Sequence, residues 1–247
     1  FCLDHLSDAE QRDLERDLDL AARVQRGLLP ATDLALPGWR IRTHWQPVGV
    51  VSGDFYDVVR PDPECESAYV LFGDVAGKGV AAAMLVSHLC ATFRALAAAA
   101  PPVAELVERI NRVFKESALS PMFATLVCGR MEADGVVELC VAGHCPPVVA
   151  GCGGARTVQP TGLPVGTFYS SSYRSTTVRL APGERLLLYT DGLSEAVDGT
   201  GCEYGSTRIE ALVGTLPAGD GGALLVAVLQ DLARHTAGVK LTADESL

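Results

Sequence analysis

The sequence of 247 residues predicts an α+β fold in which two antiparallel β-sheets pack face to face, with helices on the outside. Strand-like segments occur in runs and helix-like segments in pairs, whereas a parallel α/β fold would alternate them strictly. The strand-like segments are short and are separated by Gly, Asp and Pro, as in a meander. Because 48% of the residues are apolar, a chain of this length can bury a substantial core.

The first predicted element is a helix over residues 8–29, with Ser7 or Asp8 as its N-cap and Pro30 as its stop. It carries a heptad-like seam that is short for a coiled coil. Two interpretations stay open: the helix pairs two subunits as a weak homodimer, or it packs on its own domain. We therefore expect a linker or switch helix at 1–30 and one domain at 31–247. The seam positions are Leu14, Leu18, Ala21, Gln25 and Leu28.

The next segments predict strands and then two helices. Residues 39–46 and 52–60 alternate as strands do, and residues 68–74 form a central apolar strand. The segment 80–98 is apolar all round, so we expect a buried helix, and residues 102–117 form an amphipathic one.

The second half of the chain predicts a meander closed by two helices. Its turns are marked by glycine and proline, as in Ala181-Pro182-Gly183. The predicted strands are 122–131, 135–141, 147–150, 174–180 and 184–190, and the predicted helices are 205–213 and about 220–236.

Charge and composition limit the possible partners. The net charge is −10 with no block of Lys or Arg, so we expect no nucleic acid and no anionic membrane as partner. No uninterrupted apolar run reaches the roughly 18–20 residues of a membrane span, and residues 1–30 are charged where a signal peptide is apolar. The eight cysteines form no CxxC pair, which favours small core residues in a reducing, cytoplasmic setting.

Three aspartates, Asp54, Asp74 and Asp191, each lie at the end of a strand-like segment beside a glycine. Carboxylates gathered at one spot raise each other's pKa unless a cation lies between them. Since all the donors are oxygen atoms, the cation would be Mg²⁺ or Mn²⁺.

Two other readings compete for the central stretch, residues 69–80. A phosphate-binding P-loop is disfavoured, because Gly73 to Gly79 is one residue short of GxxxxGK[ST] and places a carboxylate where phosphate would lie. Alternatively, Asp74 and Asp191 cap a helix and a turn without any ion. The residues alone leave the capping and the metal interpretations open.

Seven motifs extend the pattern in one order along the chain. Together they resemble the SpoIIE/RsbU-type branch of the protein phosphatase 2C superfamily, from about residue 20 to the C-terminus. This resemblance implies an αββα sandwich. The motifs are Val24-Gln25-x-x-Leu28-Leu29-Pro30, Ser52-Gly53-Asp54-Phe55-Tyr56-Asp57, Gly73-Asp74-Val75-Ala76-Gly77-Lys78-Gly79-Val80-Ala81-Ala82-Ala83, Met122-Phe123-Ala124-Thr125, Ala142-Gly143-His144-x-Pro146, Gly162-Leu163-Pro164-Val165-Gly166 and Leu188-Tyr189-Thr190-Asp191-Gly192-Leu193-x-Glu195-Ala196.

The resemblance also implies a site with two divalent ions, Mn²⁺ or Mg²⁺. Asp74 would bridge both ions, the carbonyl of Val75 would assist, and Asp54 would bind one ion. Asp191 would bind the other ion together with a final Asp near the C-terminus.

That final residue is where the chain departs from the family pattern, Asp-Asp-x-Thr. Aligning Asp244-Glu245 on it keeps the first Asp, whereas the other register puts Ala243 at the ligand position. We prefer Asp244, because Ser246-Leu247 then begins the closing strand of a sheet.

The implied activity is that of a metal-dependent protein serine/threonine phosphatase, with Asp54, Asp74 and Asp191 as the catalytic carboxylates around a metal-activated water. The implied substrate is a phosphorylated anti-sigma-factor antagonist, and the N-terminal helix would join an upstream sensory domain. The alternative is an inactive or weak binding module that keeps the fold without the ions. His144 is expected to be a turn residue rather than a general acid, and Asp57 to be structural.

Overall fold

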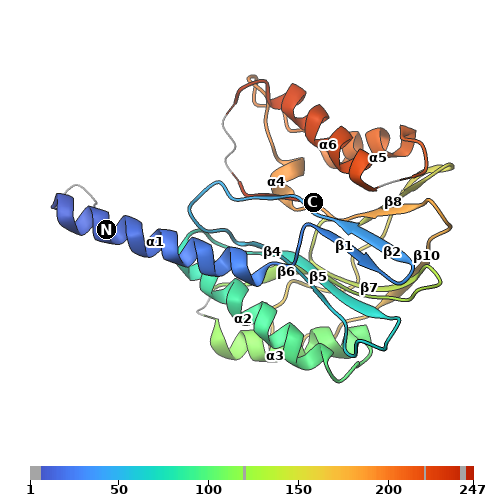
Figure 1. Cartoon of the computed structure of the whole chain (residues 1–247), viewed down its shortest axis with the longest axis horizontal. Helices are drawn as coiled ribbons and strands as arrows, with labels where there is room; N and C mark the ends of the chain where they lie inside the picture. Colours follow the sequence, from blue (N-terminus) through green and yellow to red (C-terminus); the bar gives the residue numbers. More distant parts are fainter. Residues whose placement is uncertain (1–6, 119–120, 220, 240–242) are drawn as a thin grey trace.

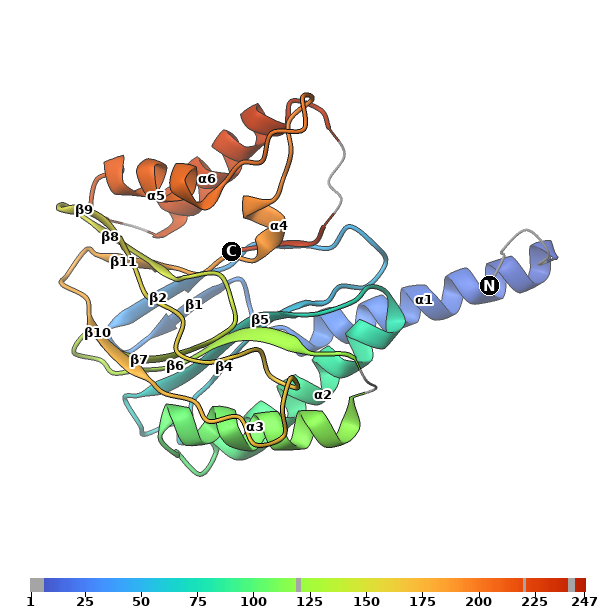
Figure 2. The same cartoon turned by 180° about the vertical axis from the view of Figure 1, so that it is seen from behind.

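Two β-layers lie face to face between two pairs of helices, as the sequence predicts (Figures 1 and 2). The computed structural model describes residues 7–118, 121–219, 221–239 and 243–247. Short turns connect most neighbouring strands, whereas helices connect β5 to β6 and follow β11. This arrangement confirms the α+β sandwich.

The first sheet has five antiparallel strands in the order β10-β7-β6-β5-β4. The strand β5, predicted to be central, is an inner strand next to the edge strand β4, and β6 is the middle one; β5 is buried along almost its whole length, as its apolar run predicts. The strands are β4 (Asp54–Val59), β5 (Ala68–Val75), β6 (Ala124–Met131), β7 (Val136–Ala142) and β10 (Thr176–Arg179).

The second layer is made of three separate pieces, β1-β2, β11-β8-β9 and β12-β3. The hairpin of β8 and β9 was not predicted in full, because β9 has only four residues and follows a glycine-containing turn. The strands are β1 (Asp33–Leu36), β2 (Trp39–Arg42), β3 (Trp45–Gln46), β8 (Val148–Gly151), β9 (Gly154–Thr157), β11 (Arg185–Leu187) and β12 (Glu245–Ser246).

Apolar side chains from both layers meet in the space between the sheets. Val127 and Leu139 of the first sheet and Val149 of the second are fully buried there. Trp39 packs against this core and donates its indole N–H to the carbonyl of Glu132 at 2.8 Å. The hydrophobic effect of this interface holds the two layers together.

Helices α2 (Val80–Ala97) and α3 (Val103–Ser117) cover the outer face of the five-stranded sheet. The expectation that the first of these is buried all round is wrong, because one side is open to solvent and Met84 is 68% exposed. The sequence predicts no membrane span, and this expectation is also corrected. Among the described residues, α2 is long and apolar enough to cross a membrane, by length and composition only. The helix was not predicted as a possible span because Ser87, His88 and Arg94 interrupt its apolar run. Its other side packs into the core with α3 and the sheet.

Helices α5 (Ser206–Thr215) and α6 (Gly221–Thr236) cover the other sheet, where Ile209, Val213 and Val228 are fully buried. Residue 220, the predicted start of the last helix, lies outside the described residues. A short helix, α4 (Asp191–Ser194), was missed, since four residues give no periodicity to detect.

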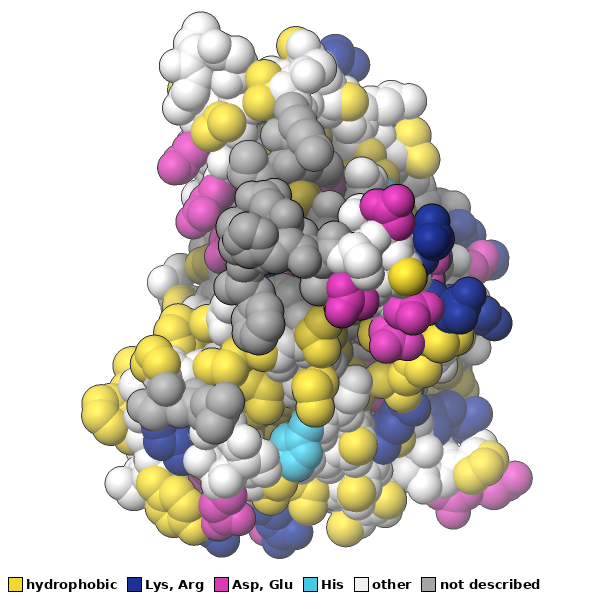
Figure 3. Space-filling model, turned by 90° about the vertical axis from the view of Figure 1, so that its left-hand side faces the viewer, with side chains coloured by type: hydrophobic (Ala, Val, Ile, Leu, Met, Phe, Trp, Pro, Cys, Tyr) yellow, Lys and Arg dark blue, Asp and Glu magenta, His cyan; other side chains and the backbone are white. Residues whose placement is uncertain are grey.

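Helix α1 (Asp8–Leu28) begins at Ser7, which forms a capping box with Glu10. Its N-terminal half projects from the molecule (Figure 1), and apolar side chains gather below it on the face shown in Figure 3. Its other end docks on the domain through the buried Gln25, whose amide donates to Ser52 O at 2.7 Å and accepts from Ser52 N at 2.9 Å. Gln25 therefore makes an intramolecular contact, which favours the interpretation that this end of α1 packs on its own domain. The homodimer stays a prediction, as does the domain boundary at residue 30.

The cysteines that the structure describes are all free. Cys90, Cys128 and Cys140 are buried in the core, as predicted, while Cys2 lies outside the described residues.

We expect Gln25→Leu to lower the free energy of unfolding by about 2 kcal/mol, because it leaves the N–H and C=O of the fully buried Ser52 without partners. Urea unfolding followed by circular dichroism measures this change. Val24→Ala is the matched control, since Val24 is the neighbouring residue and is 65% exposed. Equal stabilities of the two variants would show that the docking contact is dispensable.

Candidate metal centre

Asp54 and Asp74 lie directly opposite each other at the end of the β4–β5 ladder. Residues at opposed positions of an antiparallel pair project to the same face of the sheet, with Cβ atoms about 5 Å apart. Asp54 is buried and Asp74 is half-buried. The strand register therefore brings together two of the predicted carboxylates.

Gly53 shapes the space beside this pair. A Cβ atom at this position would lie 2.5 Å from Asp74 Oδ1 and 2.9 Å from the carbonyl oxygen of Val75. Val75 N–H donates to Gly53 O at 3.1 Å, which holds the two segments at this close approach. Because Gly53 has no side chain, its backbone can lie close to two of the predicted ligand oxygens, Asp74 Oδ1 and Val75 O.

Asp244 reaches the same place from the C-terminus. Its Oδ2 accepts hydrogen bonds from Ser52 Oγ at 2.7 Å and Gly53 N at 3.0 Å, and its Oδ1 accepts one from Val48 N at 2.7 Å. These contacts place Asp244 beside the residue that precedes Asp54, which supports the preferred register of the C-terminal motif. Residues 240–242, which precede this segment, lie outside the described part of the chain.

Asp191 is the first residue of α4 and is exposed. The next residue, Gly192, packs so tightly on the C-terminal segment that a Cβ atom would lie 1.8 Å from the carbonyl oxygen of Asp244. The preceding residue, Thr190, donates its hydroxyl to Asp54 Oδ2 at 2.9 Å and accepts from Ser246 N at 3.2 Å. Four chain segments that are far apart in sequence therefore meet at one end of the sandwich.

The electrostatics of the cluster are unfavourable in the absence of a cation. Burial, together with the negative charges of Asp244 and Asp191, raises the pKa of Asp54 to about 7, against the opposing effect of the Ser246 and Thr190 hydroxyls. Burial and the charges of the other three aspartates raise the pKa of Asp74 to about 8. A divalent ion among these groups would offset the repulsion and favour the ionised forms.

The carboxylates are neighbours, but they are not arranged as a finished cage. Across residues 7–118, 121–219, 221–239 and 243–247, no three His, Cys, Asp or Glu side chains already surround a point where an ion could be held. Asp244 instead bonds to protein donors on both oxygens. The donors fit a hard cation in chemistry, since all are oxygen atoms, and ligation would require some side chains to turn.

Two residues near the site have structural roles. His144 is buried, its Nδ1 lies 2.8 Å from Thr125 Oγ1, and burial lowers its pKa to about 4. It is neutral at pH 7 and matches the expected turn residue rather than a general acid. Asp57 is buried and accepts from Arg94 Nε at 2.7 Å, so it forms an ion pair away from the aspartate cluster.

The residues that orient the carboxylates, Ser52 and Thr190, were not predicted from the sequence. Ser52 bonds to Asp244 and also accepts from Asp54 N at 3.0 Å, while Thr190 bonds to Asp54. The sequence does contain a pattern that indicates them, because a hydroxyl residue directly precedes both Gly53-Asp54 and Asp191-Gly192. The partner of each hydroxyl lies more than a hundred residues away and could not be assigned from the sequence.

The chain is similar in fold to solved structures and in sequence to known proteins. The SiaA-PP2C domain of Pseudomonas aeruginosa has a TM-score of 0.82 at 19% identity, covering 98% of this chain and 97% of that one. Protein IcfG of Synechocystis sp. is 26% identical over 78% of this chain, and phosphoserine phosphatase RsbU of Bacillus subtilis is 24% identical over 75%. The chain spans 35% and 55%, respectively, of the lengths of these two relatives.

The family model described as Stage II sporulation protein E (SpoIIE) matches residues 66–245. The matched segment runs from the start of strand β5 to β12 and so includes three of the four aspartates. Because the match covers well over half of the chain, this protein belongs to the SpoIIE family, a group of PP2C-type serine phosphatases.

Proposed function

We propose that this chain is a metal-dependent protein serine/threonine phosphatase that uses water activated by two Mn²⁺ or Mg²⁺ ions. The observation that carries the proposal is the opposed pair Asp54 and Asp74, on which Gly53 packs closely because it has no side chain. The raised pKa values of both groups support a cation as the missing partner. Relatives named phosphoserine phosphatases, RsbU and RsbP of Bacillus subtilis, support the reaction class.

The ligands would be the carboxylates of Asp54, Asp74, Asp191 and Asp244 and the carbonyl of Val75. Two such ions, when bound, lower the pKa of a water and neutralise phosphoryl oxygens. The chain itself fixes the donors: the β4–β5 register sets the spacing of the first pair.

Two hydroxyl groups of the chain orient the carboxylates. Thr190 holds one oxygen of Asp54, and Ser52 holds one oxygen of Asp244. The bond from Thr190 leaves other lone pairs of Asp54 available to a cation, whereas the two oxygens of Asp244 already accept three hydrogen bonds.

A cysteine nucleophile is not favoured. Cys202 and Arg208 have the C-x5-R spacing of thiol phosphatases. However, Arg208 Nε donates to Asp231 at 2.7 Å, and its guanidinium lies 4.9 Å from the centre of the Tyr204 ring. The arginine therefore already has an anionic partner within the α5–α6 layer.

The proposed substrate is a phosphorylated regulatory protein in the cytoplasm, such as an anti-sigma-factor antagonist. Relatives named phosphoserine phosphatases support this class of substrate. Since the chain spans only part of their lengths, helix α1 would connect this domain to an upstream sensory domain. Its projecting N-terminal half leaves room for such a connection and for weak pairing with a second copy.

A second candidate is a binding module with little or no catalytic activity. It is favoured by the engagement of both oxygens of Asp244 with Ser52, Gly53 and Val48. Metal dependence of hydrolysis separates the two candidates.

We expect hydrolysis of para-nitrophenyl phosphate in millimolar Mn²⁺ and its loss when a chelator is added, with recovery when Mn²⁺ is restored. Ca²⁺ should support it poorly, because this ion prefers longer and looser coordination. A spectrophotometric assay of nitrophenolate release measures the rate. A rate that is unchanged by chelation would contradict the two-ion proposal, and no rate at all would favour the binding module.

We expect Asp74→Asn to reduce turnover by about 10³-fold, because it removes the charge that would bridge the ions while preserving side-chain size. Circular dichroism should show a native fold, since the substitution also removes like-charge repulsion. Asp62→Asn is the matched control, as it removes a charge from the exposed loop between β4 and β5. An active Asp74→Asn enzyme would make Asp74 a structural residue.

We expect Gly53→Ala to raise the Mn²⁺ concentration for half-maximal activity by about 10-fold, as for loss of a residue that orients ligands. The added Cβ atom would displace Asp74 Oδ1 and the carbonyl of Val75. Titration of the rate with Mn²⁺ measures the effect. Gly199→Ala is the control, because no atom lies within 4 Å of a Cβ atom at that position. Identical titrations would exclude the Gly53 surface from the metal site.

A further inference from the structure

Thr125 lies beside the aspartate pair at the end of the first sheet. The β5–β6 register sets it directly opposite Asp74, which the β4–β5 register sets opposite Asp54. Opposed residues of an antiparallel pair project to the same face, so the three side chains form a row across β4, β5 and β6. Thr125 is half-buried, so its side chain remains partly accessible to solvent. A hydroxyl group therefore lies next to the carboxylate that would bridge the ions.

Among the described residues, this hydroxyl has one hydrogen-bond partner. Thr125 Oγ1 lies 2.8 Å from Nδ1 of His144, which follows the end of β7. The turn between them depends on Gly143, whose φ is +67° and where a Cβ atom would collide with Pro164. Glycine at this position thus lets the chain turn back and place the imidazole ring against β6.

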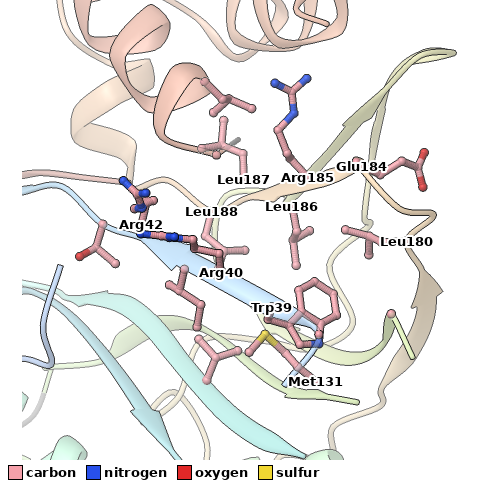
Figure 4. A pocket seen from close by; sticks show the side chains of 18 of the residues that line it. Trp39, Arg40, Arg42, Met131, Leu180, Glu184, Arg185, Leu186, Leu187 and Leu188 are labelled. Atoms are coloured by element: carbon pink, nitrogen blue, oxygen red, sulfur yellow. The ribbon is translucent and has the colours of Figure 1, made fainter. Parts of the chain in front are cut away.

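Packing fixes the orientation of the ring. His144 is only 5% exposed and meets the Phe72 ring edge to face, with centroids 5.5 Å apart and planes at 75°. Phe72 also lines an apolar cavity of about 720 Å³ between the layers (Figure 4). Within the described residues, the lining of this cavity includes neither Thr125 nor His144 nor any of the four aspartates. The ring is therefore separated from the cavity by Phe72 and linked to the site through Thr125.

The second contact of His144 indicates which ring nitrogen carries the hydrogen. Burial lowers the pKa of His144 to about 4, so the ring is neutral at pH 7, with one N–H and one acceptor. The backbone of Tyr189 opposes this fall in pKa, as a carbonyl does when it accepts from a ring N–H.

Since Nδ1 faces the Thr125 hydroxyl, we assign that N–H to Nε2. Its contact with Tyr189 is weak, because Nε2 has no hydrogen bond of ordinary geometry within the part of the chain that the structure describes. In this tautomer Nδ1 is an acceptor, so the Thr125 hydroxyl donates its hydrogen to His144.

A hydroxyl that donates its only hydrogen to His144 offers lone pairs alone to its other neighbours. It cannot donate to the carboxylate of Asp74, which is also an acceptor when ionised. A proton donor lying between the two groups would satisfy both. In the hydrolysis of a phosphate ester, the reacting water is such a donor.

We propose that Thr125 is a catalytic residue that accepts a hydrogen bond from the water that attacks phosphorus, and that His144 is a positioning residue that acts through Thr125. This inference rests on the proposed function. A fixed acceptor holds one hydrogen of the water and so directs its lone pair toward the substrate, which favours the reactive orientation. Neither residue takes up a proton, and the ring stays neutral throughout.

Nitrogen-15 NMR of the chain without added metal tests the role of His144, because the chemical shift of each ring nitrogen distinguishes N–H from a lone pair. We expect the hydrogen on Nε2 at pH 7. The variant His144→Asn identifies the signals of this ring among the five histidines. A hydrogen on Nδ1 would overturn the proposal, because Thr125 would then accept from the ring instead of donating to it.

Kinetics test the role of Thr125. Thr125→Val removes the hydroxyl and keeps the side-chain shape, and we expect it to lower kcat by about 10-fold to 100-fold while KM stays unchanged. Thr125→Ser keeps the hydroxyl and should restore kcat. Thr177→Val is the matched control, since Thr177 is an exposed residue of β10 in the same sheet. A Thr125→Val enzyme as fast as the parent would overturn the proposal, as would a slow Thr125→Ser enzyme, which would make Thr125 a packing residue.

Calorimetric titration with Mn²⁺ separates this inference from the proposed function. We expect the parent and Thr125→Val to bind Mn²⁺ equally, because Thr125 would hold the water and not the ions. Weaker binding by Thr125→Val would overturn the role of Thr125 alone. A parent chain that neither binds Mn²⁺ nor hydrolyses para-nitrophenyl phosphate would overturn the proposed function, and the role of Thr125 with it.

Discussion

The structure depends on the antiparallel register between β4 and β5. It sets Asp54 opposite Asp74 at the end of the ladder. A slip by one residue would turn Asp54 to the other face and break the pair, because strand side chains alternate with a period of two. The apolar residues of β5, such as Tyr69 and Leu71, resist that slip, since each has a fixed position in the core between the sheet and α2. Core packing thus specifies the positions of the charged groups.

A second constraint is Ser52, a fully buried residue through which several elements are joined. Its backbone bonds to Gln25 of α1, and its hydroxyl bonds to Asp244 and to the amide of Asp54. The docking of α1 and the position of the C-terminal carboxylate therefore share one side chain and one peptide group. A movement of α1 has a direct physical route to the aspartate cluster.

Much of the fold could be predicted from the sequence, because the strands that carry it have long or alternating apolar patterns. β5, β6 and the amphipathic helix α3 are the clearest cases. The short elements α4 and β9 could not be predicted, since a few residues show no period. The exposed side of α2 was also missed: Met84 and Val80 are apolar residues in solvent, so composition alone misstates their burial.

The candidate site was predictable in part for a related reason. The glycines beside the aspartates mark places where two backbones approach closely, as Gly53 and Gly192 do. What the sequence could not supply was the pairing of distant groups. The roles of Ser52, Thr190 and Gln25 depend on contacts set by tertiary structure, and a hydroxyl or an amide in a loop has many possible partners. The split of the second β-layer likewise depends on which strand edges meet in space.

These long-range contacts also explain why the site and the fold form together. Ser52 and Asp244 are 192 residues apart in sequence, and Asp54 and Thr190 are 136 apart. Closing such loops costs entropy before any contact stabilises them. The gathered carboxylates add electrostatic repulsion, which the raised pKa values of Asp54 and Asp74 express. The apolar cores must therefore supply the free energy that brings the aspartates together. A cation that binds only to the assembled cluster would stabilise the folded state by mass action and offset part of the electrostatic repulsion. Metal binding and the stability of this end of the sandwich are therefore thermodynamically linked.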